Sequence, residues 1–360
     1  MNKELRIKKL QEIVLSKPYM SGIRIPYMGD TLNLSAHLIP IEFLIYNKYN
    51  GRIASRVKSY EMQNDTLDPE REEHKTVIEK FLWESKKDRN KHTMNDLIKH
   101  QRQQVFGIVT FDGKIIDGNR RAMLLGKINE MRKEEKQKDK KLDFAQNFLA
   151  VILPDTVKDD KEISKLETIF QMGEDKKLDY NPIEKYLKCF DLKAVFGFSE
   201  AEIAEMMSES TRTIKEWLEI KELMDDYLKH YGYQEIYTRL EKREGQFVNL
   251  NTYLKRYGSK TKNKNVKWMY KEKDIAMLKA ISFDYIRAQY EGKQFRSIGQ
   301  TSLAGSIFQH EDIWKEFKKN HEEKIDPISN AETSVTDLRK DNPNGDLSKL
   351  LKARDNKWIN

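Results

Sequence analysis

A strand, a tight turn, a second strand and a helix follow one another between residues 105 and 132, and this unit limits the possible folds more than any other part of the chain. Asp-Gly at 112–113 separates two runs rich in β-branched residues, which is the strongest short-range signal for a β-hairpin. Gly118 follows the second run, and a helix is expected over 122–132. A hairpin that leads through a glycine bend into a helix predicts an α/β domain.

The flanking segments give weaker signals. A basic helix is predicted over 4–16, and the prolines and glycines of 18–29 argue against regular structure there. The apolar run 38–45 suits a strand, with Pro40 at its start or on a sheet edge. Residues 148–153 predict another buried strand. These segments place a small sheet in the first half of the chain.

Helical patterns dominate the rest of the chain. The very polar stretch 64–104 is mostly helical, residues 159–230 read as helices throughout, and an amphipathic helix is expected near 275–290. Residues 329–346 look like a loose polar connector before a short final helix. We therefore expect an α+β fold: a small α/β domain, then a mostly helical domain, then a helical C-terminal region. The predicted divisions are a basic extension at 1–35, the α/β domain at 36–157, a helical domain at 158–230, a basic helical region at 231–328 and a polar tail at 329–360.

Composition narrows the functional classes. The formal net charge is +8, from 66 Lys and Arg against 58 Asp and Glu, so a polyanion is the leading class of partner. The single cysteine, Cys189, excludes an internal disulfide and a cysteine-based zinc site. No apolar run approaches the roughly 18 residues that a membrane span needs, and the charged N-terminus does not resemble a secretory signal. We expect a cytoplasmic protein without a membrane partner, and no histidine cluster predicts a metal site.

The glycine bend at Gly118 is the first passage with chemical content. A glycine between a strand and a helix allows a tight turn, and the first amides of the helix then point outward, where an anion can bind. Arginine adds a fork of donors suited to phosphate. The alternative is a plain strand–helix connection in which Asp117 or Asn119 only caps the helix. The candidate phosphate-binding residues here are Asp117, Gly118, Asn119, Arg120 and Arg121.

A second arginine-bearing helix start lies upstream. Asn50 and Gly51 precede Arg52 and Arg56, which are four residues apart and therefore share one face of a helix. Two arginine-bearing helix starts in one α/β unit are suited to binding a polyphosphate. Asn50, Gly51, Arg52 and Arg56 are therefore added to the candidate phosphate-binding residues. The alternative is that both arginines pair with acidic residues, at Glu61 or in the run 65–73.

The second passage with chemical content spans residues 198–218. Ser199 and Glu202 form a capping box that starts a helix. Apolar residues supply the inward positions of two short helices, namely Ile203, Met207, Ile214 and Trp217, with the small Ala204 where the helices cross. This spacing is typical of a helix-turn-helix, whose second helix enters the DNA major groove. The alternative is an ordinary helical hairpin in a bundle. The candidate DNA-binding residues are Ser210, Thr211, Arg212, Thr213 and Lys215.

Taken in order, these passages resemble the ParB/sulfiredoxin-like family, in particular ParB-type chromosome- and plasmid-partition proteins and related phage or plasmid factors. The resemblance covers roughly residues 36–225. Residues 117–122 resemble its Gly-x-Arg-Arg phosphate box, residues 50–52 its earlier Asn/Arg box, and residues 178–185 the helix start between its two domains. It implies a nucleotide-binding domain that takes CTP or ATP with Mg²⁺, a DNA-binding helical domain, double-stranded DNA as partner, and a homodimer.

The chain also departs from the family pattern. Residues 167–171 read Glu-Thr-Ile-Phe-Gln where the family commonly has Glu-Asn-x-Gln to help hold metal and triphosphate, which counts against Mg-CTP hydrolysis. The charged stretch 64–104 is longer than the family leads us to expect. Sulfiredoxin chemistry needs a reactive cysteine beside the glycine bend, and Cys189 lies outside that domain.

The leading hypothesis is therefore a ParB-like DNA-binding protein, for partition or regulation, with a nucleotide-binding N-terminal domain. One alternative is an NTPase or Mg²⁺-dependent nuclease acting on nucleic acid, with Asp112, Asp117 and Glu42 as possible metal-holding carboxylates. Another is a non-enzymatic scaffold. No catalytic residue is assigned.

The basic segment 255–273 leaves two interpretations open. It carries eight Lys and Arg against one acidic residue, Glu272, and aromatic residues lie in and beside it. These aromatics either stack on bases or belong to a C-terminal core. They are Tyr253, Tyr257, Trp268 and Tyr270.

Overall fold

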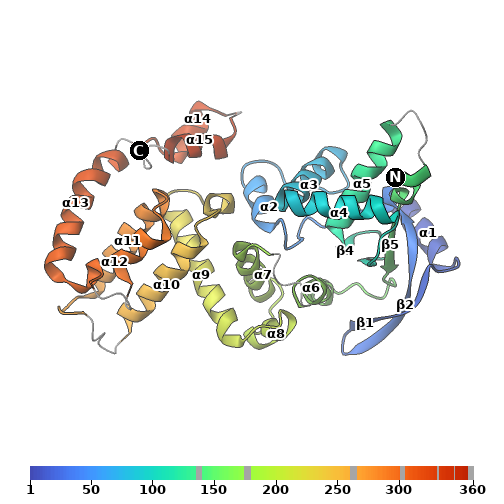
Figure 1. The fold of residues 1–360 in the computed structure, drawn as a ribbon, viewed down its shortest axis with the longest axis horizontal. Helices are drawn as coiled ribbons and strands as arrows, with labels where there is room; N and C mark the ends of the chain where they lie inside the picture. The colour runs from blue at the N-terminus through green and yellow to red at the C-terminus, as the bar shows by residue number, and fades with distance from the viewer. Residues whose placement is uncertain are drawn as a thin grey trace. The chain divides into compact units, whose positions relative to one another are not determined.

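The chain forms two compact units in the computed structural model (Figure 1). The first contains Met1–Val57 and Asn64–Lys215, and the second contains Lys58–Gln63 and Glu216–Asn360. The structure describes residues 1–134, 140–173, 180–259, 266–300, 305–330, 332–343 and 345–355. The first unit therefore holds both the predicted phosphate site and the start of the predicted DNA-binding helix.

A five-stranded mixed sheet organises the first unit. Its strands lie in the order β1-β2-β5-β3-β4, with β3 parallel to β5 and every other neighbouring pair antiparallel. The strands are β1 (Met20–Tyr27), β2 (Asp30–Pro40), β3 (Gly107–Val109), β4 (Ile115–Asp117) and β5 (Asn147–Ile152). This sheet, surrounded by helices, confirms the predicted α+β class.

The central strand β5 is buried on both faces. Leu149 and Val151 join a core cluster with Leu166 of α6 (Asp160–Thr168), while Phe148 and Ala150 alternate with them along the strand and are fully buried as well. Helix α5 (Asn119–Glu134) packs on β5, and α1 (Lys3–Val14) packs on β2 (Figure 1). The two covered faces explain why residues 148–153 are uninterruptedly apolar.

The predicted hairpin, glycine bend and helix are confirmed. β3 and β4 pair antiparallel around the Asp112-Gly113 turn, and α5 begins earlier than predicted, at Asn119. The prediction of irregular structure over 18–29 is wrong, because β1 and β2 form an antiparallel hairpin there. Gly22 and Gly29 have φ of +77° and +80°, so these glycines shape the hairpin instead of ending regular structure.

Two predicted boundaries change with this hairpin. The predicted boundary between residues 35 and 36 falls inside β2. Pro40 ends that strand and does not start one, and Ile41–Phe43 continues as a single 3-10 turn. Proline is tolerated at a strand end because no further ladder hydrogen bond is needed from it.

The remaining helices of the first unit include the predicted helical stretches around 64–104 and 159–230. A π-helical turn at Ile169–Gly173 follows α6 directly. The other helices are the start of α2 (Ala54–Glu61), α3 (Glu72–Ser85), α4 (Lys87–His100), α7 (Pro182–Ala194), α8 (Glu200–Met206) and the start of α9 (Thr211–His230).

The second unit is helical across the residues described. Beyond the rest of α9 it contains α10 (Glu244–Gly258), α11 (Glu272–Arg287), α12 (Gly292–Gly299), α13 (Glu311–Asn330), α14 (Val335–Asp341) and α15 (Leu347–Asp355). The predicted amphipathic helix near 275–290 corresponds to α11. The predicted loose connector over 329–346 is wrong, because α14 lies within it.

A buried network of charges secures the end of the second unit. Arg287 bonds Asp355 at 2.7 Å, and Arg354 bonds the hydroxyl of Tyr233 at 2.7 Å. Arg239 also pairs with Asp355, and Glu332 pairs with both Arg287 and Arg354. Buried charges are tolerated only when they are paired in this way. The last turn of α15 is therefore part of the core.

Aromatic packing decides between the two interpretations of the basic segment. Tyr253 and Tyr257 are fully buried, and the Tyr257 ring lies 4.6 Å from that of Phe308. Trp268 donates a hydrogen bond to the Phe308 carbonyl at 2.8 Å. Tyr253 and Tyr257 therefore belong to the core of the second unit. Trp268 and Tyr270 are half-buried and pack against Phe308, which favours the core interpretation for them as well. Residues 260–265 of the basic segment lie outside the described part of the chain.

Two further expectations bear on this fold. Parts of the predicted inter-domain helix start (178–179) and of the 329–360 tail also lie outside the described residues. In the part of the chain that the structure describes, no helix combines the length and the apolar character that a bilayer span requires.

Candidate functional site

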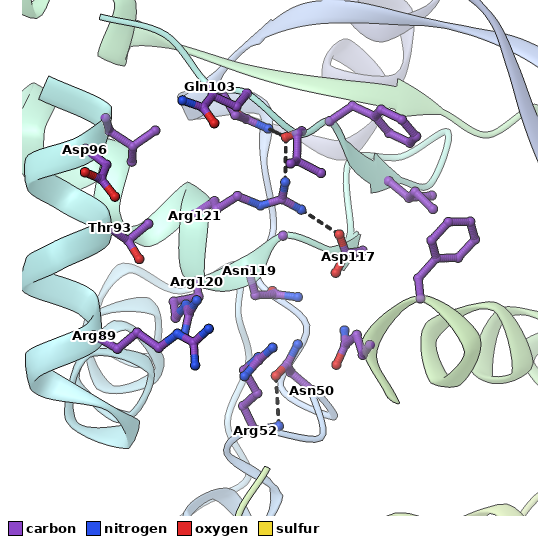
Figure 2. Close-up of a pocket in the computed structure, with 18 of the residues that line it drawn as sticks. Asn50, Arg52, Arg89, Thr93, Asp96, Gln103, Asp117, Asn119, Arg120 and Arg121 are labelled. Carbon is purple, nitrogen blue, oxygen red and sulfur yellow. Dashed lines mark hydrogen bonds and ion pairs between the residues drawn. The ribbon is translucent and has the colours of Figure 1, made fainter. Parts of the chain in front are cut away.

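A cavity of about 670 Å³ lies in the first unit beside the start of α5 (Figure 2). Seven of the nine predicted phosphate-site residues line it: Asn50 and Arg52 from the loop before α2, and five residues at the end of β4 and the start of α5. The five are Asp117, Gly118, Asn119, Arg120 and Arg121. The structure thus brings the two predicted arginine-bearing segments together at one hollow.

Gly118 makes the bend that aims the start of α5 at this cavity. Its φ is +102°, and a Cβ atom at this position would lie 2.6 Å from Cζ of Phe148. Any other residue is therefore excluded both by backbone conformation and by the ring beneath it. The first amides of a helix have no intrahelical acceptor, so this end of α5 favours an anion.

The two arginines after the bend have different surroundings. Arg121 donates to the Val105 carbonyl at 2.5 Å and to Asp117 at 2.6 Å, so its guanidinium is fixed (Figure 2). Arg120 Nη1 is buried and has no hydrogen-bond partner. Burial, together with the positive charges of Arg52, Arg89 and Arg121, lowers the pKa of Arg120 to about 10. An incompletely paired guanidinium at a cavity is the arrangement expected where an anion binds.

Asn119 ties the two arginine-bearing segments together. Its side-chain oxygen accepts from the Asn47 amide at 2.8 Å, and its side-chain nitrogen donates to the Ile115 carbonyl at 3.1 Å. Asn119 therefore holds the loop before α2 against the end of β4. Its two polar ends are both engaged, so its contribution is to position the cavity wall.

Arg52 is held over an aromatic ring. The Asn50 side chain accepts from the Arg52 amide at 3.0 Å, which fixes the turn. The guanidinium carbon of Arg52 lies 4.5 Å from the centre of the Tyr180 ring. Burial raises the pKa of Tyr180, so its hydroxyl stays neutral and donates to Gln171 at 2.9 Å. The Tyr180 ring thus supports the guanidinium of Arg52, and Arg52 also lines the cavity.

Two other predicted phosphate-site residues lie outside the cavity lining. Arg56 pairs with Glu84 at 3.2 Å, and it does not line the cavity with Arg52. Glu84 is a residue of α3, so Arg56 pairs with an acidic residue, as the alternative interpretation expected of it. Gly51 is buried, and a Cβ atom there would lie 2.9 Å from Cε of Met172. Gly51 permits close packing behind the arginine loop.

Helix α4 contributes cavity residues that the sequence interpretation missed. Arg89, Thr93 and Asp96 line the cavity from one side (Figure 2), and His100 of the same helix lines it as well. They are spaced four, three and four residues apart, which places them along one face of the helix. This spacing was visible in the sequence, but charged residues on a helix are usually a solvated face.

The stretch that departs from the family pattern makes structural contacts. Glu167 and Lys188 form a buried pair at 3.0 Å. Gln171 donates to the Ile116 carbonyl at 2.7 Å and accepts from Tyr180. Both side chains therefore hold α6 and the π-helical turn against neighbouring elements.

The carboxylates proposed for a nuclease have separate partners. Asp112 accepts from Thr110 at 2.5 Å and pairs with Lys3 at 3.1 Å, whereas Asp117 pairs with Arg121. Among the residues that the structure describes, no three His, Cys, Asp or Glu side chains group in a way that could hold a metal ion.

Helices α8 and α9 form the predicted helical pair. The capping box at Ser199 and Glu202 starts α8, and Ser210 caps α9 by accepting from the Thr213 amide at 3.0 Å. Ser208 has a φ of +48° in the turn between them, a position that glycine often fills in a helix-turn-helix. Of the side chains predicted to pack inward, Ile203, Met207 and Ile214 are buried, as is Ala204, whereas Trp217 is half-buried.

The predicted DNA-binding residues lie at the start of α9. Four of them are exposed, and Thr213 is half-buried. Lys215 lies 3.7 Å from Glu200, which also pairs with Lys193 at 2.6 Å. One acidic residue at the start of α8 thus contacts two exposed lysines from neighbouring helices. The exposed residues are Ser210, Thr211, Arg212 and Lys215.

Comparisons with known proteins find similarity at the level of solved structures, where seven chains match. No protein-family model and no curated protein matches the sequence. Among solved structures, a crystal structure of the C-terminally truncated chromosome-partitioning protein ParB from Caulobacter crescentus, complexed to the centromeric parS site, matches with 13% sequence identity. The match covers 73% of this chain and 98% of that chain, with a TM-score of 0.34.

Proposed function

We propose that this protein binds a nucleoside polyphosphate in the arginine-lined cavity and double-stranded DNA through the start of α9. The observation that carries the first half is Arg120, whose Nη1 is buried without a hydrogen-bond partner beside the cavity. A buried cation that lacks an acceptor is costly unless a negative group arrives to pair with it.

The neighbours of Arg120 favour a multiply charged anion. Arg52, Arg89 and Arg121 all raise the positive potential at its guanidinium. A single phosphate gives one or two negative charges, whereas a di- or triphosphate offers enough oxygens to serve several arginines at once. The start of α5 adds the dipole of a 16-residue helix to the same hollow.

The second half of the proposal rests on the helical pair. Thr211 and Arg212 are exposed on the first turn of α9, and α8 packs behind that turn through buried side chains. A major groove admits a helix presented in this way, with hydroxyls and arginine reaching bases and phosphates. The net charge of +8 favours such an association.

Ligand-dependent thermal unfolding tests the nucleotide half. We expect at least one of ATP, CTP, GTP and UTP, with Mg²⁺, to raise the melting temperature, because binding to the native state alone stabilises it. Arg120→Glu removes this shift, since it places a negative charge where phosphate binds. The matched control is Arg24→Glu on β1, an exposed arginine outside the cavity, which keeps the shift. Equal shifts in both variants would disprove the assignment.

The enzymatic alternative has its own test. A plasmid-nicking assay with Mg²⁺, repeated with Asp117→Ala, separates it from the proposal. Nicking that depends on Asp117 would favour the nuclease. The homodimer and the cytoplasmic location stay predictions from the sequence.

A further inference from the structure

One face of α4 carries a row of polar side chains along the cavity, and their charge changes from one end of the row to the other. Arg89, Thr93, Asp96 and His100 all line it, and their span of 11 residues corresponds to about 16 Å along the helix axis. The row begins with a cation and continues with a hydroxyl and a carboxylate. Such an order distinguishes the two ends of an elongated ligand.

The cationic end of the row belongs to the arginine cluster. Arg89 is close enough to Arg120 to help lower its pKa, and Figure 2 shows the two guanidinium groups near each other and near Arg52. Three separate segments of the chain therefore deliver positive charge to one place: the loop before α2, α4 and the start of α5. Phosphate groups belong at this end.

The carboxylate of Asp96 lies further along the same face. Seven residues separate it from Arg89, which is about 10 Å of helix. An ionised carboxylate only accepts hydrogen bonds, so it favours a ligand group with O–H or N–H donors and disfavours another phosphate. The hydroxyls of a ribose and the exocyclic amine of a base are donors of this kind.

We infer that α4 is the wall that selects a nucleoside polyphosphate over an inorganic polyphosphate. Arg89 shares the phosphates with Arg120 and Arg52, and Asp96 accepts a hydrogen bond from the sugar or base, with Thr93 between them. The cavity of about 670 Å³ is of the size that small-molecule sites usually have. This inference rests on the proposed function and adds to it the part of the ligand that is not phosphate.

Calorimetric titration of the full chain with two kinds of ligand tests the inference. The probes are the four ribonucleoside triphosphates and inorganic tripolyphosphate, all at the same Mg²⁺ concentration. We expect Asp96→Asn to weaken the nucleotide that binds best by roughly tenfold, because one charge-assisted hydrogen bond is lost. The same variant leaves tripolyphosphate binding unchanged or slightly tighter. Arg89→Gln weakens both ligands by similar factors.

Matched controls are available on the same helix. Asp88 and Lys91 are exposed on α4 and do not line the cavity, so Asp88→Asn and Lys91→Gln leave both affinities within about twofold. Circular dichroism and the melting temperature without ligand establish that each variant is folded. All four positions are exposed, so their replacement leaves the core intact.

The failures of the two proposals are distinguishable. If wild type binds neither nucleotide nor tripolyphosphate, both proposals fall. If Asp96→Asn changes the two ligands by the same factor, or if Arg89→Gln leaves tripolyphosphate binding unchanged, the role of α4 is wrong while the phosphate site at Arg120 stands.

Discussion

Glu184 accepts two hydrogen bonds from Ser55, one from the amide nitrogen at 3.0 Å and one from the hydroxyl at 2.5 Å. This contact joins the first turn of α7 to the first turn of α2, which follows the Arg52 loop directly. Burial raises the pKa of Glu184 to about 7, and the Ser55 hydrogen bonds limit that rise. A buried carboxyl therefore titrates near neutral pH beside the segment that carries Arg52.

The pH dependence of stability follows from this raised pKa. Because the folded state binds the Glu184 proton more tightly than the unfolded state, this group stabilises the fold at low pH, and the contribution is lost as pH rises from about 4.5 to 7. Urea unfolding of wild type and Glu184→Gln at pH 5, 6, 7 and 8 measures it. We expect the stability of wild type relative to the variant to fall by up to about 3 kcal/mol between pH 5 and pH 8. A constant difference would contradict the raised pKa.

Replacement of Arg120 is expected to stabilise the protein without ligand. Arg120→Met removes a buried charge that is incompletely paired and is surrounded by other arginines, so the free energy of unfolding rises by about 1 kcal/mol. The neighbouring Arg121→Met is expected to lower the free energy of unfolding. It leaves Asp117 without its ion-pair partner and removes one of the two donors to the Val105 carbonyl, the other being Gln103. Chemical denaturation of both variants without nucleotide compares them. A loss of stability in both would mean that Arg120 is a structural residue.

Arg212 is expected to set part of the salt dependence of DNA binding. Arg212→Ala removes one phosphate or base contact, so affinity falls, and the slope of log K against log salt becomes less steep by about 1 if the contact is to phosphate. Fluorescence anisotropy with a labelled duplex over a range of salt concentrations measures both quantities. Arg24→Ala is the control, since that arginine is exposed on β1. An unchanged affinity and slope for Arg212→Ala would remove α9 as the DNA-binding helix.

Glu200 is expected to restrain DNA binding. It contacts Lys193 and Lys215, so Glu200→Gln releases both lysines for phosphate. We expect affinity to rise by up to about fivefold and the salt slope to steepen by about 1 to 2. Glu73→Gln changes the net charge equally on α3 and controls for long-range effects. If the two variants raised affinity alike, the contact at Glu200 would have no specific part.

Local signals predicted the central part of the fold. The Asp112-Gly113 hairpin and the bend at Gly118 depend on the backbone conformations of a few adjacent residues, and such conformations are specified by the residues themselves. The β1–β2 hairpin was missed because its prolines and glycines look like breaks in isolation. An edge strand tolerates them, and only the pairing with β5 shows that β2 belongs to a sheet.

The candidate site was predicted only in part, for a different reason. Arg52 and Arg56 are equivalent in the sequence, yet Arg56 meets Glu84 in α3 while Arg52 lies over Tyr180 and lines the cavity. These partners are distant in sequence, so helical spacing alone does not separate the two arginines. Arg89 and Asp96 were missed for another reason. The pattern of polar residues along a helix face is the same whether that face borders water or a cavity.

The ring of Phe148 has a consequence beyond the hydrophobic core. It occupies the space that a Cβ atom would need at both Gly107 and Gly118, so a single aromatic side chain on the middle strand lies beneath two neighbouring turns of the backbone. The height at which α5 begins above the sheet is therefore set by the size of that ring. A smaller residue at 148 would let the helix start sink and would reshape the mouth of the hollow, although residue 148 does not itself line that hollow.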